Sequence, residues 1–85
     1  MNPYIMRMYL KKLTLDDVKN ISLKNNIILN DIELLDVYNY IKSNYNDYLD
    51  CKISDEEVIR DASLILGKDN YNKLYNIYLK YKDNK

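Results

Sequence analysis

This chain has 85 residues, of which 47% are hydrophobic and 31% charged, and its 13 basic residues balance 13 acidic ones. The balanced charge argues against a dedicated nucleic-acid binder, and the apolar fraction argues against a disordered chain. The absence of histidine removes the usual proton shuttle of enzymes at neutral pH. The length predicts one domain.

Three helix-start signals each precede an apolar stripe at helical spacing. They are Thr14-x-x-Asp17, Asn30-x-x-Glu33 and Ser54-x-x-Glu57. In each, a hydroxyl or amide can cap a helix while the carboxylate three residues later reaches back to the cap. The chain has only one Gly and one Pro. These features predict an all-α fold, with residues 1–85 forming a single compact bundle of about five short helices.

The first helix is expected at about residues 3–11. Pro3 suits its first position, because the N–H that proline lacks would have no partner there. Residues 1–12 are rich in Met and Tyr, and we expect them to form a short docking helix that frays.

Thr14 opens a second helix, and Asn25-Asn26 is its expected end because Asn tolerates the left-handed conformation. The apolar residues 27–29 follow. Their β propensity allows a strand, but no partner strand is evident, so we interpret them as a buried linker between two helices and leave the strand as the alternative.

Asn30 opens the longest helix, at about 31–48, whose apolar residues recur at spacings of 4, 3, 4 and 3. Ser54 opens a fourth helix, at about 55–66, and we expect Gly67 to end it as a left-handed cap. Asp69 is then expected to cap a fifth helix at about 70–82.

The order of these signals resembles the YqfT-like proteins, a small family of low-GC Gram-positive bacteria. The matching stretches are Leu13-Thr14-x-Asp16-Asp17, Ile27-Ile28-Leu29-Asn30, Ser54 to Gly67 and Asn70 to Tyr81. They cover most of the chain, but they are capping and core patterns. The resemblance therefore implies a small soluble all-helical protein, and it supplies no catalytic or binding residues.

No motif in the chain indicates catalytic residues, a cofactor or a metal. Cys51 is the only cysteine, and without His neither a Ser–His nor a Cys–His pair can form. The acids at the start of the fourth helix are explained by the helix dipole, and Gly67-Lys68 lacks the rest of a phosphate-binding loop. We therefore predict that the protein is not an enzyme.

A single cysteine cannot form an internal disulfide, which favours a reducing compartment. No apolar run approaches the roughly 20 residues that span a bilayer, and the start of the chain lacks the features of a secretory signal. We therefore expect a cytoplasmic protein with no membrane partner.

Basic residues gather at both ends of the chain, while residues 13–67 hold five basic and eleven acidic residues. The ends can pair with the acidic middle across the bundle, or they can form a basic patch. On the second interpretation the phosphate contacts would be Arg7, Lys11, Lys12, Lys73, Lys80 and Lys82. Weak nucleic-acid binding through these residues is our alternative function.

The third and fifth helices carry apolar residues on more than one face, namely Val37, Tyr40, Ile77 and Tyr81. Surplus apolar surface marks a site for a partner or for self-association, although a helix at the centre of a bundle also needs two apolar faces. The ten tyrosines follow either from function or from A/T-rich codons. The leading prediction is a small non-catalytic protein that binds another protein or itself.

Overall fold

The computed structural model describes residues 2–83, and every regular element within them is a helix. The helices are α1 (Pro3–Lys11), α2 (Leu15–Lys24), α3 (Asp31–Leu49), α4 (Asp55–Ile65) and α5 (Lys68–Asp83). The predicted all-α class and the number of helices are confirmed. The bounds differ from the expected ones by one or two residues, which is the usual uncertainty at helix ends.

The N-terminal caps form as the sequence predicts. Thr14 and Asn30 each make a complete capping box with the acid three residues later. Ser54 makes one half of the motif, since its hydroxyl accepts a hydrogen bond from the Glu57 N–H at 3.2 Å. These contacts satisfy N–H groups that have no partner inside their own helices.

The C-terminal ends differ from the prediction at one position. Asn26, after α2, has a φ of 61°, as expected, and Cys51, after α3, has a φ of 62°. Gly67 has no positive φ, so its predicted left-handed cap is wrong. Its carbonyl instead accepts the first backbone bond of α5, from the Tyr71 N–H at 2.8 Å. This bond explains why α5 begins at Lys68 and Asp69 lies in its first turn rather than at its cap.

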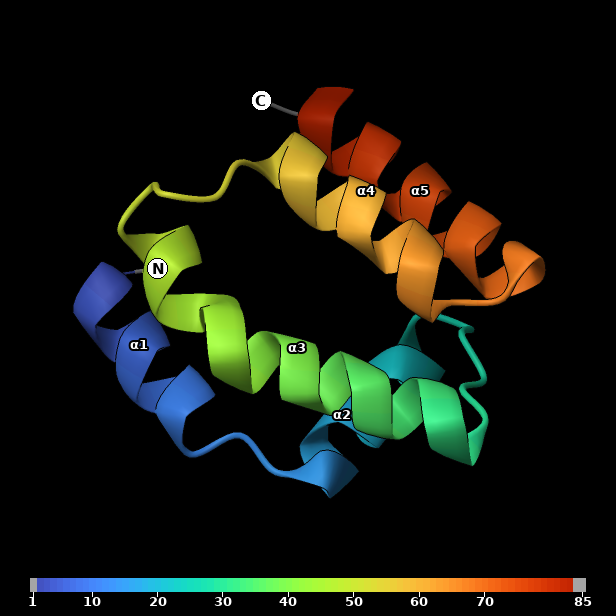
Figure 1. The fold of residues 1–85 in the computed structure, drawn as a ribbon, viewed down its shortest axis with the longest axis horizontal. Coiled ribbons are helices and arrows are strands. Elements are labelled where there is room, and N and C mark those ends of the chain that lie inside the picture. The colour runs from blue at the N-terminus through green and yellow to red at the C-terminus, as the bar shows by residue number, and fades with distance from the viewer. Residues whose placement is uncertain (1, 84–85) are drawn as a thin grey trace.

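The longest helix, α3, is the scaffold of the bundle (Figure 1). α1 lies along one side of it, α2 crosses behind it in this view, and α4 and α5 form a pair on the side opposite α1. The backbones of α1, α2 and α4 each pack on α3, whereas the backbone of α5 packs only on α4. The bundle therefore consists of three helices packed directly on α3 and a fifth whose backbone packs on its neighbour α4.

The buried apolar core is small. Among the described residues the buried hydrophobic side chains are Leu13, Val18, Ile27 and Ile59, at 4–9% exposure. Residues 27–29 form no strand, and Ile27 points inward while Ile28 is 72% exposed, so only part of the expected buried linker is buried. With so little apolar burial, polar contacts between helices take on part of the work of holding them together.

No helix in the stretch 2–83 combines the length and the apolar character needed to cross a membrane.

Candidate interaction surface

The four predicted interaction residues fall into two groups. Val37 and Tyr40 on α3 and Ile77 on α5 are half-buried within the bundle. Tyr81 on the last turns of α5 is 52% exposed. The apolar second faces of α3 and α5 are thus partly used in packing, and only Tyr81 presents a large exposed area.

Tyr40 links α3 to α4. Its hydroxyl donates a 2.7 Å hydrogen bond to Asp61 Oδ2. Burial and this bond to the carboxylate raise the pKa of Tyr40 to about 12, because both favour the neutral phenol. Tyr40 therefore acts as an internal polar bridge between two helices.

The predicted basic residues also separate. Arg7 is engaged, since it donates to Asn46 Oδ1 at 2.6 Å and to Asp50 Oδ1 at 2.7 Å. Lys11 and Lys12 at the end of α1 are exposed, as are three lysines on α5, Lys73, Lys80 and Lys82. α1 and α5 do not pack against each other. The lysines near the end of α1 and the lysines of α5 are therefore carried by two helices that are not neighbours.

Two side chains fix α1 beside the C-terminal half of α3. The Arg7 contacts are one anchor. The other is Lys42, whose ammonium donates to backbone carbonyls at the end of α1, those of Leu10 (3.2 Å), Lys11 (2.5 Å) and Leu13 (3.3 Å). A cation at this end also complements the negative pole of the helix dipole.

The largest group of exposed apolar side chains on one helix belongs to α1. Met6 and Leu10 on its inner side are half-buried. Its outer side carries Tyr4, Ile5, Met8 and Tyr9, which are 69%, 56%, 43% and 47% exposed. We call these four residues the outer face of α1. A helix that is apolar on all sides is normally covered on all sides, and this one is covered only by α3.

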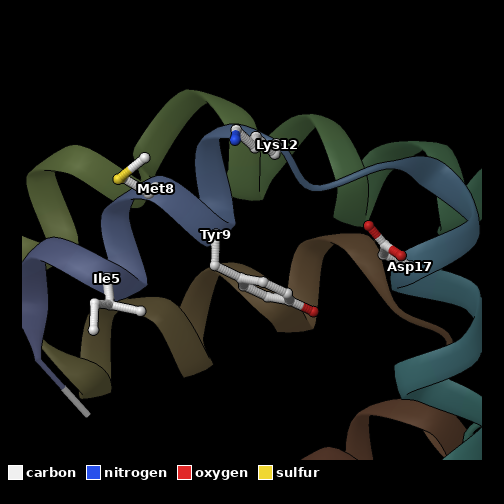
Figure 2. Close-up of a pocket in the computed structure, with 5 residues that line it drawn as sticks. All are labelled: Ile5, Met8, Tyr9, Lys12 and Asp17. Carbon is white, nitrogen blue, oxygen red and sulfur yellow. The ribbon is translucent and has the colours of Figure 1, made fainter.

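A shallow hollow of about 390 Å³ lies along the outer face of α1. Figure 2 shows its five lining residues, which are Ile5, Met8 and Tyr9 on α1, Lys12 directly after α1, and Asp17 at the start of α2. Sequence reasoning had named α1 a docking helix but had placed the interaction surface elsewhere. The missed signal is the pair of apolar stripes in α1, one at 6 and 10 and one at 4, 5, 8 and 9.

A second exposed apolar group lies at the start of α3. Ile32 is 74% exposed and Leu35 is 50% exposed. Helical spacing places Asp36 one turn after Ile32 and Asp31 one turn before Leu35, so carboxylates flank both apolar side chains. We call Asp31, Ile32, Leu35 and Asp36 the acidic stripe. Neither aspartate forms an ion pair within residues 2–83.

Glu33, on the buried side of the same turn of α3, connects three segments of the chain. Its carboxylate accepts hydrogen bonds from the backbone N–H of Asn30 at 3.1 Å and of Gly67 at 2.7 Å. Asn70 Nδ2 donates to both carboxylate oxygens, at 3.1 and 3.3 Å, and to the carbonyl of Ile28 at 2.9 Å. The Gly67 bond is the main cause that lowers the pKa of Glu33, against the opposing effect of burial.

This carboxylate also accounts for the second hollow of the surface. That hollow has a volume of about 440 Å³ and lies at the start of α5, between Glu33, Gly67 and Lys73. The start of a helix attracts anions because its N–H groups point outward. Here Glu33 already occupies the Gly67 N–H, so the hollow is explained by an internal anion.

Within residues 2–83, no group of three or more Cys, Asp or Glu side chains is arranged to hold a metal ion. Cys51 is exposed and lies in the turn after α3.

No family model, curated protein or solved structure matches this chain. The resemblance to the YqfT-like family therefore stays a prediction.

Proposed function

We propose that this chain is a non-catalytic, cytoplasmic protein-interaction module, and that it binds a partner protein through the outer face of α1. The observation that carries the proposal is the exposure of four large apolar side chains on successive turns of one helix. Scattered exposed apolar residues are common on soluble proteins, but contiguous apolar patches mark sites of association.

The way α1 is attached supports the same proposal. The contacts of Arg7 and Lys42 hold α1 firmly against α3, so the outer face is presented on an anchored helix. A rigid apolar face loses little conformational entropy when a partner covers it. Tyrosine and methionine are also favoured at interfaces, the first for its large ring and the second for its adaptability.

Capture of partners from a native lysate by tagged protein tests this proposal. The test variant is I5Q/M8Q, which removes apolar area from the outer face of α1. The control is L64Q on α4, because Leu64 is 85% exposed and lies outside the outer face of α1. Both variants should keep the helical circular dichroism of the wild type, since all three positions are exposed.

The proposal predicts that captured proteins are retained by L64Q and reduced at least about tenfold by I5Q/M8Q, since central apolar contacts dominate binding energy. Equal capture by the wild type and I5Q/M8Q would show that the outer face of α1 is not the docking surface.

A further inference from the structure

We propose that the outer face of α1 binds the acidic stripe of a second copy of this chain. This inference rests on the proposed function and names its partner. It follows from three properties of the two surfaces: both are apolar and exposed, they lie beside opposite charges, and those charges do not pair within one chain.

Both surfaces are short apolar ridges. The outer face of α1 presents four exposed side chains, Ile5, Met8 and the two tyrosines, and the acidic stripe presents two, Ile32 and Leu35. The stripe lies on the scaffold α3 itself and the outer face lies on a helix anchored to α3, so each ridge is firm. Two such ridges can pack with their axes about 8–10 Å apart.

The charges are complementary. Lys11 and Lys12 follow the outer face of α1, and residues 1–12 hold no acid. The one acid that lines the hollow, Asp17, accepts a hydrogen bond from the Thr14 N–H within its own capping box. The acidic stripe has one aspartate at each end, Asp31 and Asp36. Because both ends are acidic, the lysines of α1 meet a carboxylate whether the two helices run parallel or antiparallel. None of these four charges forms an ion pair within the described chain.

Within a single chain these charges do not pair. The end of α1 that carries Lys11 is held at Lys42, and Asp36 and Asp31 lie six and eleven residues before Lys42, about 9 and 16 Å away along α3. Figure 1 shows α1 beside one end of α3 and the start of α3 at the other end. The charges of each surface are therefore available to a second molecule.

The two surfaces are different, so the contact is heterologous. Each copy offers one α1 face and one acidic stripe, and repetition of the contact makes chains unless a ring closes. Two small patches bury less than a standard interface, so we expect weak association in the micromolar to millimolar range. The mean molecular mass of the protein in solution should therefore rise gradually with concentration above the monomer mass of 10.2 kDa.

Charge reversal tests the pairing by sedimentation equilibrium at protein concentrations of about 10 to 500 µM and at about 50 mM salt, where screening is weak. The variants are K11E/K12E on α1, D31K/D36K on α3, and the four substitutions combined in one chain. K80E/K82E and D47K/D69K are matched controls, because they place the same charge changes at exposed helix positions outside both surfaces.

We expect each double reversal to weaken association at least about fivefold, since like charges then face each other. The combined variant should associate again, and so should an equimolar mixture of the two double variants, in which each α1 face finds an opposite stripe. Both controls should match the wild type.

Three outcomes would overturn the inference: a wild type that stays at 10.2 kDa throughout, a D31K/D36K variant that associates like the wild type, or a combined variant that stays monomeric. A monomeric wild type whose lysate capture still depends on Ile5 and Met8 would leave the proposed function standing and exclude only the second copy as partner. If I5Q/M8Q captures the same proteins as the wild type, and K11E/K12E also associates like the wild type, both the proposed function and the second copy as partner are excluded.

Discussion

The carboxylate of Glu33 accepts a hydrogen bond from the backbone N–H of Gly67 at 2.7 Å, across 34 positions of the sequence. Glu33 also accepts the Asn30 N–H that completes the cap of α3. One carboxylate therefore binds the backbone at the start of α3 and the backbone just before α5. The backbone of α5 packs only on α4 among the helices, so this bond and those from Asn70 are what tie the start of α5 to α3.

Replacing Glu33 by Gln should lower the free energy of unfolding by about 1–3 kcal/mol, because an amide has one acceptor where the carboxylate has two and places an NH₂ group among donors. The control is E57Q, which occupies the equivalent position of α4 and is exposed. It should cost less than about 1 kcal/mol. Urea unfolding of both variants measures the difference, and equal losses would contradict the bridging role.

Glu33 also predicts a pH dependence. Its pKa in the folded chain is lowered, chiefly by the Gly67 bond. The stabilisation is therefore complete above the ordinary glutamate pKa and is lost as the pH falls through the lowered value. The free energy of unfolding should decline on acidification below about pH 4.5, and more steeply for the wild type than for E33Q. Parallel acid profiles would contradict this assignment.

Tyr40 and Tyr48 should ionise near pH 12, because each pKa is raised to about 12. For Tyr40 the first cause is burial, and for Tyr48 it is the hydrogen bond to Asp55. The contribution to stability is present below the ordinary tyrosine pKa of about 10 and is lost as the pH rises through the folded value. Ultraviolet titration of the wild type, Y40F and Y48F checks this, and each substitution should remove one late-titrating group.

The Tyr40–Asp61 bond should also show in stability. Y40F should cost about 1–2 kcal/mol, since it leaves the half-buried carboxylate without its donor. The control is Y45F, because the Tyr45 hydroxyl has no hydrogen bond to another residue of the described chain. A loss in Y45F as large as that in Y40F would show that the cost comes from removing a tyrosine hydroxyl in general, and not from the bond to Asp61.

Lys42 should stabilise α1 in particular. K42M keeps the aliphatic stem but removes the ammonium from three carbonyls, and we expect a loss of about 1–3 kcal/mol. Hydrogen exchange should speed up most at the amides of α1. The exposed Lys19 on α2 supplies the control, K19M, which should leave α1 protected. Unchanged exchange in K42M would contradict the anchoring role.

Cys51 lies in the left-handed region that favours glycine, whereas Gly67 does not. We therefore expect a gain in stability from adding a glycine at 51, and no loss from removing the glycine at 67. C51G should stabilise by about 0.5–1 kcal/mol, because Cys51 has a φ of 62° that glycine adopts without strain. G67A should be neutral or stabilising by up to about 1 kcal/mol, because φ is not positive there and a Cβ would lie 3.5 Å from Glu33 Oε2, an ordinary contact. A loss above about 1 kcal/mol in G67A would contradict the observed backbone.

Local signals predicted the helices well because capping is a local interaction. Thr14 and Asn30 bind groups only three residues away, so their sequence motifs hold the whole contact. Asn26 was likewise predictable from its own tolerance of the left-handed conformation. Gly67 was wrongly predicted, because what determines its backbone is the start of α5 and a carboxylate from α3, and neither is visible in the residues around it.

The candidate surface was less predictable for the same reason. The sequence shows that Tyr40 lies on a second apolar face of α3. Only the fold shows that its hydroxyl donates a hydrogen bond to Asp61 of α4. α1 contained two apolar stripes in its sequence, yet which of them faces α3 depends on Arg7 and Lys42 contacts made over 30 to 40 residues.

Dilution of isotope-labelled protein, followed by amide NMR spectra, tests the central claim most directly, because it reports each contact by residue. The account predicts concentration-dependent shifts at residues 4–12 of α1 and 31–36 of α3, with α4 and α5 unchanged. Spectra that do not change with concentration, or shifts that fall on α4 and α5, would contradict it.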